Sequence, residues 1–289
     1  MSVTITRATE CLPVVSVIVT TRNEEKNIGN CLKSVLRQTY PRDRLELIVV
    51  DNQSEDRTKS IAEGYAQQVL DCGPERSAQR NLGARKASGK YVLYLDADMV
   101  LENKVVDECV SKCEIENCVG VYIPERIVGS GFWTRVRAFE RTFYDASCID
   151  AIRFVRRDKF LETGGFDESL TGPEDWDLDR RIQKAGKVGI INSPLYHNES
   201  VFDLEKYVAK KRYYSKSFST YVQKWGREDP IARRQLGVYY RLLGVFVEGG
   251  NWRTLLRHPI LTIGMYYLRL RVALNYLSVL WKGSGGGTG

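Results

Sequence analysis

The sequence predicts an α/β fold with a doubly wound, mainly parallel sheet, and three observations predict it. Four short apolar runs lie in the first 125 residues, helix-like stretches separate them, and polar residues follow the first three runs. Near-continuous apolar strands indicate burial on both faces, as in parallel sheets covered by helices. Strand–helix alternation then predicts an open sheet with ligands at the carboxyl ends of its strands.

The expected strands are rich in β-branched and aromatic residues. They lie at 14–20, 45–50 and 91–95, with a weaker fourth at 118–123. The stretches with helical periodicity lie between and after them, at 24–39, 56–68, 77–87 and 103–113.

Polar residues follow the first three strands directly. The strands end in residues 20–24, in residues 51–56 and in Asp96-Ala97-Asp98. We expect these three ends to form one crevice, because the carboxyl ends of parallel strands meet at the same edge of a sheet. Asn23 and Asp56 are equally well explained as helix N-caps, whereas capping does not explain Asp51, Asp96 and Asp98.

Asp96 and Asp98 indicate a metal site. Alternate residues of a strand point to the same side, so the two carboxylates lie together and repel each other unless a cation intervenes. Hard divalent ions prefer oxygen ligands and commonly link a carboxylate to substrate phosphates. The pattern therefore favours Mn²⁺ or Mg²⁺ bound to the diphosphate of a nucleotide.

Six motifs together resemble family 2 glycosyltransferases over residues 14–200. They occur in the family's order at 17–24, 48–58, 80–84, 95–98, 164–168 and 174–178. The resemblance implies a GT-A fold, a UDP- or GDP-sugar donor, a transferred hexose and inversion at the anomeric carbon.

The resemblance also assigns residues to the donor. Asp98 would bind the metal directly, and Asp96 would reach the ribose or a metal-bound water. Asp51 would accept a hydrogen bond from the base. The remaining expected nucleotide-sugar contacts are Thr20, Arg22, Glu24, Arg80, Asn81, Ala97, Gly164 and Gly165.

Glu174 and Asp175 are the expected catalytic residues, with Asp175 as the base. Inversion needs one carboxylate to take the proton of the attacking acceptor hydroxyl. Without the resemblance, both residues would be explained as acids that stabilise the start of a helix. His197 follows Asp175 by 22 residues. The resemblance makes it a third metal ligand, although a lone histidine is usually a packed or solvated residue.

The charge is unevenly distributed along the chain. Residues 205–282 carry 15 Lys/Arg against 4 Asp/Glu, whereas residues 1–204 carry 28 against 32. We therefore expect a catalytic domain at 1–204, a basic helical region at 205–282 and a tag-like remnant at 283–289. Within the basic region, Arg212 and Lys216 share a helical face that can contact the donor diphosphate or remain a solvated surface.

Residues 236–247 and 260–282 are apolar but interrupted by arginines. They are expected to form amphipathic helices on an anionic membrane, with the protein peripheral at the cytoplasmic face of the cell membrane and a lipid-linked or glycolipid acceptor nearby. An ordinary helical subdomain or a dimer interface is the alternative. The apolar content of the region argues against a nucleic-acid partner.

Two other functions are compatible with parts of the pattern. A sugar nucleotidyltransferase would need a glycine-rich phosphate loop after the first strand, and residues 21–25 contain no glycine. A catalytically inactive sugar- or lipid-binding scaffold is disfavoured by the intact carboxylates. The seven cysteines are an odd number, and Cys109, Cys113 and Cys118 are expected to be buried thiols or to form an occasional disulfide, since no fourth zinc ligand lies nearby.

Overall fold

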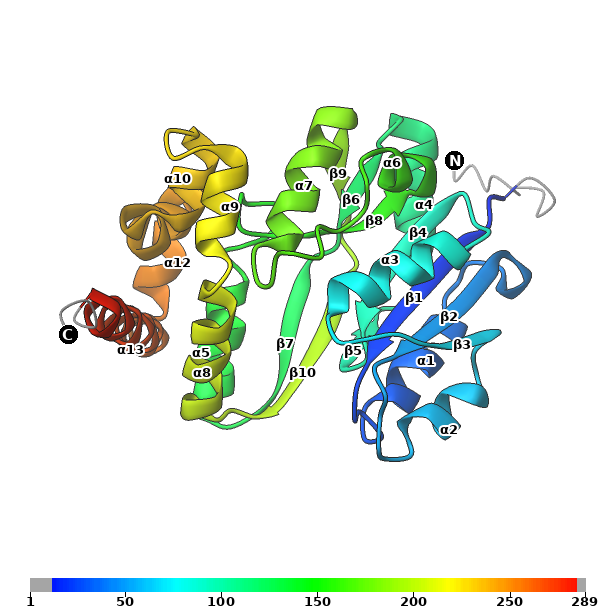
Figure 1. Ribbon diagram of the computed structural model, residues 1–289, viewed down its shortest axis with the longest axis horizontal. Coiled ribbons are helices and arrows are strands. Elements are labelled where there is room, and N and C mark those ends of the chain that lie inside the picture. Colours follow the sequence, from blue (N-terminus) through cyan, green and yellow to red (C-terminus); the bar gives the residue numbers. More distant parts are fainter. Residues whose placement is uncertain (1–11, 285–289) are drawn as a thin grey trace. The chain divides into compact units, whose positions relative to one another are not determined.

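The computed structural model describes residues 12–284, whose elements are labelled in Figure 1. The chain divides into two compact units. The described part of the first unit comprises residues 12–124, Ile152–Phe166 and Leu178–Tyr196, and that of the second comprises Glu125–Ala151, Asp167–Asp177 and residues 197–284. The charge pattern predicted a domain boundary at residue 204. The two units, which are defined by contacts between residues, meet at other positions along the chain.

The first unit contains a seven-stranded mixed sheet in the order β3-β2-β1-β4-β8-β6-β9. Strands β1 to β4 of this sheet are parallel, whereas β8 runs antiparallel to both β4 and β6. The strands are β1 (Val15–Thr21), β2 (Leu45–Asp51), β3 (Gln68–Asp71), β4 (Tyr91–Asp96), β6 (Gly120–Tyr122), β8 (Ile152–Arg156) and β9 (Val188–Ile190), and the short strand β5 (Met99–Leu101) also belongs to this unit. All four predicted strands are present, and the parallel part of the sheet is as predicted.

A helix is present in each predicted stretch; α1 and α2 are shorter than predicted, whereas the bounds of α3 and α4 agree within three residues. Helix α2 ends at Glu63, so the residues expected to continue it turn into β3 instead. The elements are α1 (Ile28–Leu36), the 3-10 turn η2 (Arg42–Arg44), α2 (Thr58–Glu63), α3 (Arg76–Lys86), α4 (Val105–Glu116) and α6 (Arg157–Glu162). Helix α7 (Glu174–Ala185) and strand β10 (Leu195–Val201) each begin in one unit and end in the other.

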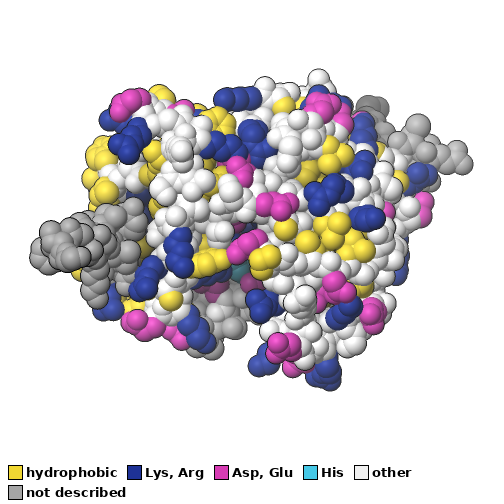
Figure 2. Space-filling model, in the orientation of Figure 1, with side chains coloured by type: hydrophobic (Ala, Val, Ile, Leu, Met, Phe, Trp, Pro, Cys, Tyr) yellow, Lys and Arg dark blue, Asp and Glu magenta, His cyan; other side chains and the backbone are white. Residues whose placement is uncertain are grey.

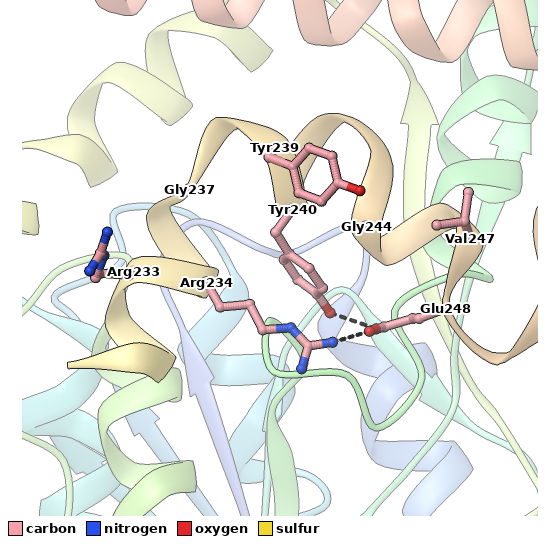
Figure 3. A pocket seen from close by; sticks show the side chains of 8 residues that line it. All are labelled: Arg233, Arg234, Gly237, Tyr239, Tyr240, Gly244, Val247 and Glu248. Atoms are coloured by element: carbon pink, nitrogen blue, oxygen red, sulfur yellow. Dashed lines mark hydrogen bonds and ion pairs between the residues drawn. The ribbon is translucent and has the colours of Figure 1, made fainter. Parts of the chain in front are cut away.

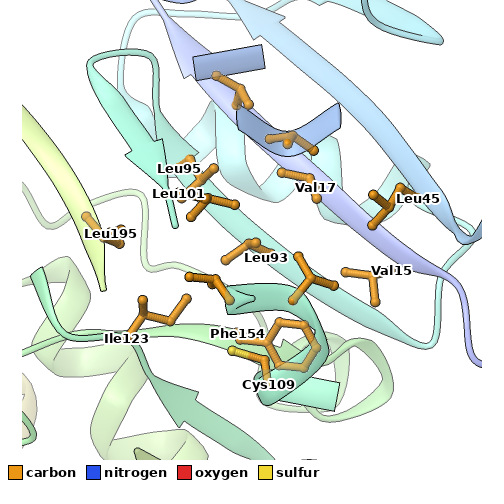
Figure 4. Close-up of a cluster of buried hydrophobic side chains, with 14 of the residues drawn as sticks. Val15, Val17, Leu45, Leu93, Leu95, Leu101, Cys109, Ile123, Phe154 and Leu195 are labelled. Atoms are coloured by element: carbon orange, nitrogen blue, oxygen red, sulfur yellow. The ribbon is translucent and has the colours of Figure 1, made fainter. Parts of the chain in front are cut away.

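The two faces of the sheet carry separate apolar cores because successive side chains of β1 point to opposite sides. Val15, Val17 and Val19 pack with residues of α1 and α4 on one face, a part of which Figure 4 shows. Ile18 lies on the other face, with residues of α3, α6 and α7. Of the two states expected for Cys109, Cys113 and Cys118, the structure shows buried free thiols rather than a disulfide.

The second unit is mainly helical. Its elements are β7 (Glu125–Ser130), α5 (Phe132–Arg141), α8 (Leu204–Ser215), α9 (Phe218–Trp225), α10 (Pro230–Leu236), the π-helix η3 (Tyr240–Gly244), α11 (Val245–Val247), the 3-10 turn η4 (Glu248–Gly250), α12 (Trp252–Arg257) and α13 (Pro259–Ser284). Its main core joins α5 to α13 through Val136, Phe139, Met265 and Leu268. No helix in the described residues is both long enough and apolar enough to span a bilayer.

Candidate active site

The carboxyl ends of β1, β2 and β4 lie side by side in the first unit. The register pairs Thr20 with Asp96 and Thr21 with Asp51. The three polar strand ends predicted to form one crevice therefore do occupy one edge of the sheet.

Asp96 is held by three side chains. Its Oδ1 accepts hydrogen bonds from Thr20 Oγ1 at 3.0 Å and from an Arg80 nitrogen at 2.9 Å, and Oδ2 lies 3.4 Å from Arg76. Burial opposes ionisation of Asp96, but the guanidinium groups of Arg80 and Arg76 outweigh it and hold the pKa of this carboxyl well below its usual range. Asp96 is therefore a fixed negative charge at the strand edge.

Arg80 has a role that the sequence did not predict. Its guanidinium stacks over the rings of Tyr94 and Phe166, at 5.2 and 5.0 Å from the ring centroids. The side chain is 1% exposed. Because it is enclosed between these rings and Asp96, Arg80 acts by positioning that carboxylate.

The loops after β1 and β2 support each other. Asn23 donates its backbone N–H to Ser54 Oγ, and its side chain accepts from the backbone N–H of Glu55. Ser54 in turn donates both its N–H and its hydroxyl to the buried Asp51 carboxylate. Asp51, the predicted base-binding residue, thus also shapes the loop after β2. Arg22, which precedes Asn23 in the loop after β1, is exposed.

The negative charges of Asp96 and Asp98 act on the carboxyl group of Glu24. The pKa of Glu24 is raised by burial and then by the charges of Asp98 and Asp96, although a hydrogen bond from Asn27 opposes the rise. No group of three or more His, Cys, Asp or Glu side chains in the described part of the chain is arranged to hold a metal ion. Binding of a metal ion by Asp96 and Asp98 therefore stays a prediction.

Gly164 and Gly165 both have positive φ angles, of 87° and 66°. A Cβ on Gly165 would lie 2.5 Å from Asn81 Oδ1, so only glycine fits there. The Asn81 amide donates to the carbonyl of Phe166 and accepts from its N–H, at 2.9 and 2.8 Å. Asn81 thus holds the glycine turn in place, which again is a positioning role.

Glu174 and Asp175 lie in the first turn of α7, in the part of that helix assigned to the second unit. Glu174 is buried, whereas Asp175 is partly exposed. The following residues anchor the turn, because Trp176 Nε1 donates to the carbonyl of Ile149 and Asp177 accepts from Trp225 Nε1 at 2.9 Å. Of the two predicted catalytic carboxylates, Asp175 is the one that a substrate can reach.

The turn before α7 contacts the end of α8 and the start of α9. Thr171 donates its N–H to Ser217 Oγ, and that hydroxyl donates to the Thr171 carbonyl. Gly172 has a φ of 105°, and a Cβ there would lie 2.6 Å from Tyr214 Cβ. This packing explains why a glycine precedes the Glu174-Asp175 pair.

His197 lies in the second unit, on β10. Its Nδ1 is 2.9 Å from the Glu125 carboxylate, which also pairs with Arg141. A carboxylate on one ring nitrogen fixes the orientation and tautomer of an imidazole, an arrangement that is common for metal-binding histidines. The metal role of His197 stays a prediction.

Arg212 and Lys216 line one surface cavity of about 420 Å³ along α8. The prediction that they share a helical face is therefore confirmed, and Figure 2 shows basic side chains over this helix. Lys216 lies 5.4 Å from the centroid of the Tyr213 ring. Contact with a diphosphate stays a prediction.

The sequence did not predict several residues that hold elements of the candidate site in position. They are Arg76, Gln79, Glu125, Lys224 and Trp225. Gln79 donates to the carbonyls of Thr21 and Val50 and so closes the gap between β1 and β2. Only Arg76 and Gln79 had a signal, since they immediately precede the Arg80-Asn81 motif.

The comparisons with known proteins place this arrangement in a family. The profile described as Glycosyl transferase family 2 matches residues 16–169, which is just over half of the chain. The chain belongs to glycosyl transferase family 2. This confirms the predicted family.

Its relatives among curated proteins are also glycosyltransferases. Glycosyltransferase AglE of Haloferax volcanii is 40% identical over 97 residues, which cover 31% of this chain and 32% of that protein. The probable glycosyltransferase YdaM of Bacillus subtilis is 33% identical over 201 residues, covering 61% and 48%. This chain thus spans about a third to a half of the length of these relatives.

Solved structures confirm the α/β GT-A fold. The mannosyltransferase PcManGT of Pyrobaculum calidifontis, in complex with GDP-Man and Mn²⁺, matches with a TM-score of 0.58 and 19% identity, over 96% of this chain and 81% of that one. Residues 1–349 of Staphylococcus aureus TarS, in complex with UDP-GlcNAc, match with a TM-score of 0.56 and 17% identity, over 94% and 92%. At these identities the likeness establishes the fold alone.

Proposed function

We propose that the protein is an inverting glycosyltransferase that moves a hexose from a UDP- or GDP-sugar to a lipid-linked or glycolipid acceptor. One observation carries the proposal: Asp51 and Asp96 end the two parallel strands that flank β1, with Asp98 two residues beyond Asp96. The carboxyl edge of an open α/β sheet is where such folds bind nucleotides. Family membership and the GDP-Man and UDP-GlcNAc complexes of the structural neighbours support this assignment.

In the proposed reaction Asp175 takes the proton of the acceptor hydroxyl as its oxygen attacks the anomeric carbon. The bond to the nucleoside diphosphate breaks on the opposite face of the sugar, so the configuration inverts and the diphosphate leaves with the electron pair. The buried Trp176 and Asp177 contacts hold Asp175 at the start of α7. A fixed orientation of the base is what general-base catalysis requires.

Asp98 and Asp96 are the proposed holders of Mn²⁺ or Mg²⁺. When bound, the ion neutralises charge on the departing diphosphate. Arg80 and Arg76 keep Asp96 ionised and in place at the strand edge. Mn²⁺ in the PcManGT structure supports a metal requirement, although not the identity of the ion here.

Helices α12 and α13 are the proposed contact with an anionic membrane at the cytoplasmic face of the cell. Exposed apolar side chains recur along one side at Leu256, Ile260, Ile263, Leu270 and Leu274. A one-sided apolar surface on a strongly basic region is the pattern of a helix lying in a membrane interface. This contact would place the enzyme where a lipid-linked acceptor is available.

A cavity of about 520 Å³ in the second unit supports contact with lipid (Figure 3). Arg234 and Tyr240 both bind Glu248 inside it, and Tyr239 and Val247 are exposed. Its lining combines the two tyrosine rings and Val247 with the charged Arg233, Arg234 and Glu248, which suits an amphipathic ligand such as a lipid with a charged head group.

The test is binding and turnover of the full chain with Mn²⁺. Calorimetric titration of UDP against GDP identifies the nucleotide, and release of that nucleotide from its sugar conjugates, with a membrane lipid extract as acceptor, reports transfer. Binding of one nucleotide with lipid-dependent turnover is the expected result. Binding of neither nucleotide would overturn the proposal, and binding without turnover would instead support the inactive scaffold.

A further inference from the structure

The second unit contains a cluster of four basic side chains that the proposed reaction does not use. They are Arg137 on α5, Lys211 on α8, Arg241 on η3 and Arg269 on α13. None of them lies in the six family motifs, although Arg241 and Arg269 are among the arginines that interrupt the two apolar stretches.

Two of these cations share carboxylates. Glu140 pairs with both Arg137 and Arg269, at 2.9 Å from Arg269, and also accepts from Tyr144 at 2.7 Å. Arg137 makes a second ion pair with Glu199 at 3.3 Å. Glu140 and Glu199 therefore balance Arg137 and Arg269.

Lys211 and Arg241 lack such partners. Neither forms an ion pair with any carboxylate in the described part of the chain. The Lys211 ammonium lies 5.3 Å from the Tyr207 ring centroid, and the Arg241 guanidinium lies 4.7 Å from that of Trp176 while its Nε donates to the Gln235 carbonyl. The cluster is left with two uncompensated positive charges.

Shared contacts link the four basic residues: Lys211 and Arg137 lie over the same Tyr207 ring, at 5.3 and 4.7 Å, and Arg269 donates to the carbonyl of Arg241. Burial lowers the pKa of Lys211 to about 7, with Arg137 and Arg241 lowering it further and Glu140 opposing them. Partly buried cations without counter-charges are unfavourable, and an anionic ligand removes that cost.

We propose that Lys211 and Arg241 bind a phosphate group of a substrate. A phosphate ester carries a charge near −2, which matches the two uncompensated cations. Arginine offers paired N–H donors to phosphate, and lysine offers a point charge. Trp176, on which Arg241 stacks, follows Asp175 directly, so the phosphate site adjoins the residue proposed as the base.

The proposal rests on the proposed function for the source of this phosphate, which belongs either to the acceptor or to the donor diphosphate. Inorganic phosphate serves as the probe in a calorimetric titration of the full chain. Lys211→Gln and Arg241→Gln should each weaken phosphate binding about tenfold, as expected for a lost hydrogen bond to a charged group. Lys206→Gln is the matched control, because Lys206 lies on the same helix with 87% of its side chain exposed.

Repeating the titration with saturating UDP or GDP and Mn²⁺ distinguishes the two sources. Phosphate that still binds indicates an acceptor phosphate, and phosphate that is displaced indicates the donor diphosphate. A wild-type chain that binds no phosphate, or a folded Lys211→Gln variant that binds it normally, would overturn the site. Absence of nucleotide binding by the wild-type chain in the same titrations would instead count against the proposed function.

A second measurement needs no variant. Acetic anhydride labels uncharged amines, and phosphate bound at the site should protect Lys211 in the wild-type chain while leaving Lys206 labelled. Equal labelling of Lys211 with and without phosphate would contradict the proposal even where a variant fails to fold.

Discussion

Arg80 donates to the Asp96 carboxylate at 2.9 Å while its guanidinium lies over the Tyr94 and Phe166 rings. This contact joins α3 to the end of β4. It sets both the charge and the position of the first carboxylate in the Asp-x-Asp motif.

Arg80→Leu should lower the free energy of unfolding at pH 7 by about 3 kcal/mol, because it leaves a buried carboxylate without its principal counter-charge. The pKa of Asp96 is depressed in the folded state, so its contribution to stability is present above the ordinary carboxyl pKa and is lost as pH falls. The difference between variant and wild type should therefore shrink from pH 7 to pH 3 in urea unfolding. A difference that does not change with pH would contradict this account of the pair.

Asp175→Asn should lower the transfer rate about 10³-fold, since an amide cannot accept the proton of the acceptor hydroxyl. Nucleotide affinity, measured by calorimetry, should not change. Asp107→Asn is the control, because Asp107 is exposed on α4 and the change in charge is the same. Full turnover in the Asp175 variant would exclude it as the base.

Removal of divalent metal with a chelator should abolish both transfer and tight nucleotide binding, and Mn²⁺ or Mg²⁺ should restore them. Asp98→Asn should raise the Mn²⁺ concentration needed for half-maximal activity about tenfold or more, because it removes one charged ligand. The readout is a metal titration of nucleotide release. Metal-independent activity in the wild type would refute the assignment of Asp96 and Asp98.

Trp225→Phe should destabilise the protein by about 2 kcal/mol, because it deletes the hydrogen bond to the fully buried Asp177 carboxylate. Lys224 also pairs with Asp177, at 2.9 Å, so the turn should loosen rather than unfold. We expect a lower kcat with unchanged nucleotide affinity. An unchanged kcat would show that this anchor serves stability alone.

Replacing Ile263 and Leu270 by serine should weaken binding to vesicles of anionic phospholipid about tenfold for each residue, if each loses most of a buried side chain. Binding should also weaken with added salt. Liposome flotation measures both effects. The matched control is Ile115→Ser, because Ile115 is exposed on α4 of the first unit; an equal effect of that change would remove the special role of α13.

Local sequence patterns were enough to predict the parallel part of the sheet and the residues at its carboxyl edge. Strands β1, β2 and β4 are continuous apolar runs, and the acids directly after them need no knowledge of distant contacts to be placed. The order of the six motifs also determined the family, since each motif is local. Short strands such as β3 and β8 were not predicted, because a few residues carry too little periodicity.

The contacts of those residues could not be predicted, because they depend on how distant parts of the chain pack. Arg80 meets Asp96 from 16 residues away and Trp225 meets Asp177 from 48, and no spacing rule connects either pair. The cluster around Lys211 and Arg241 is assembled from four separate elements and is invisible in the linear chain. Local patterns follow from how adjacent side chains alternate along a strand or helix, whereas the partners of a buried charge depend on which distant elements pack together.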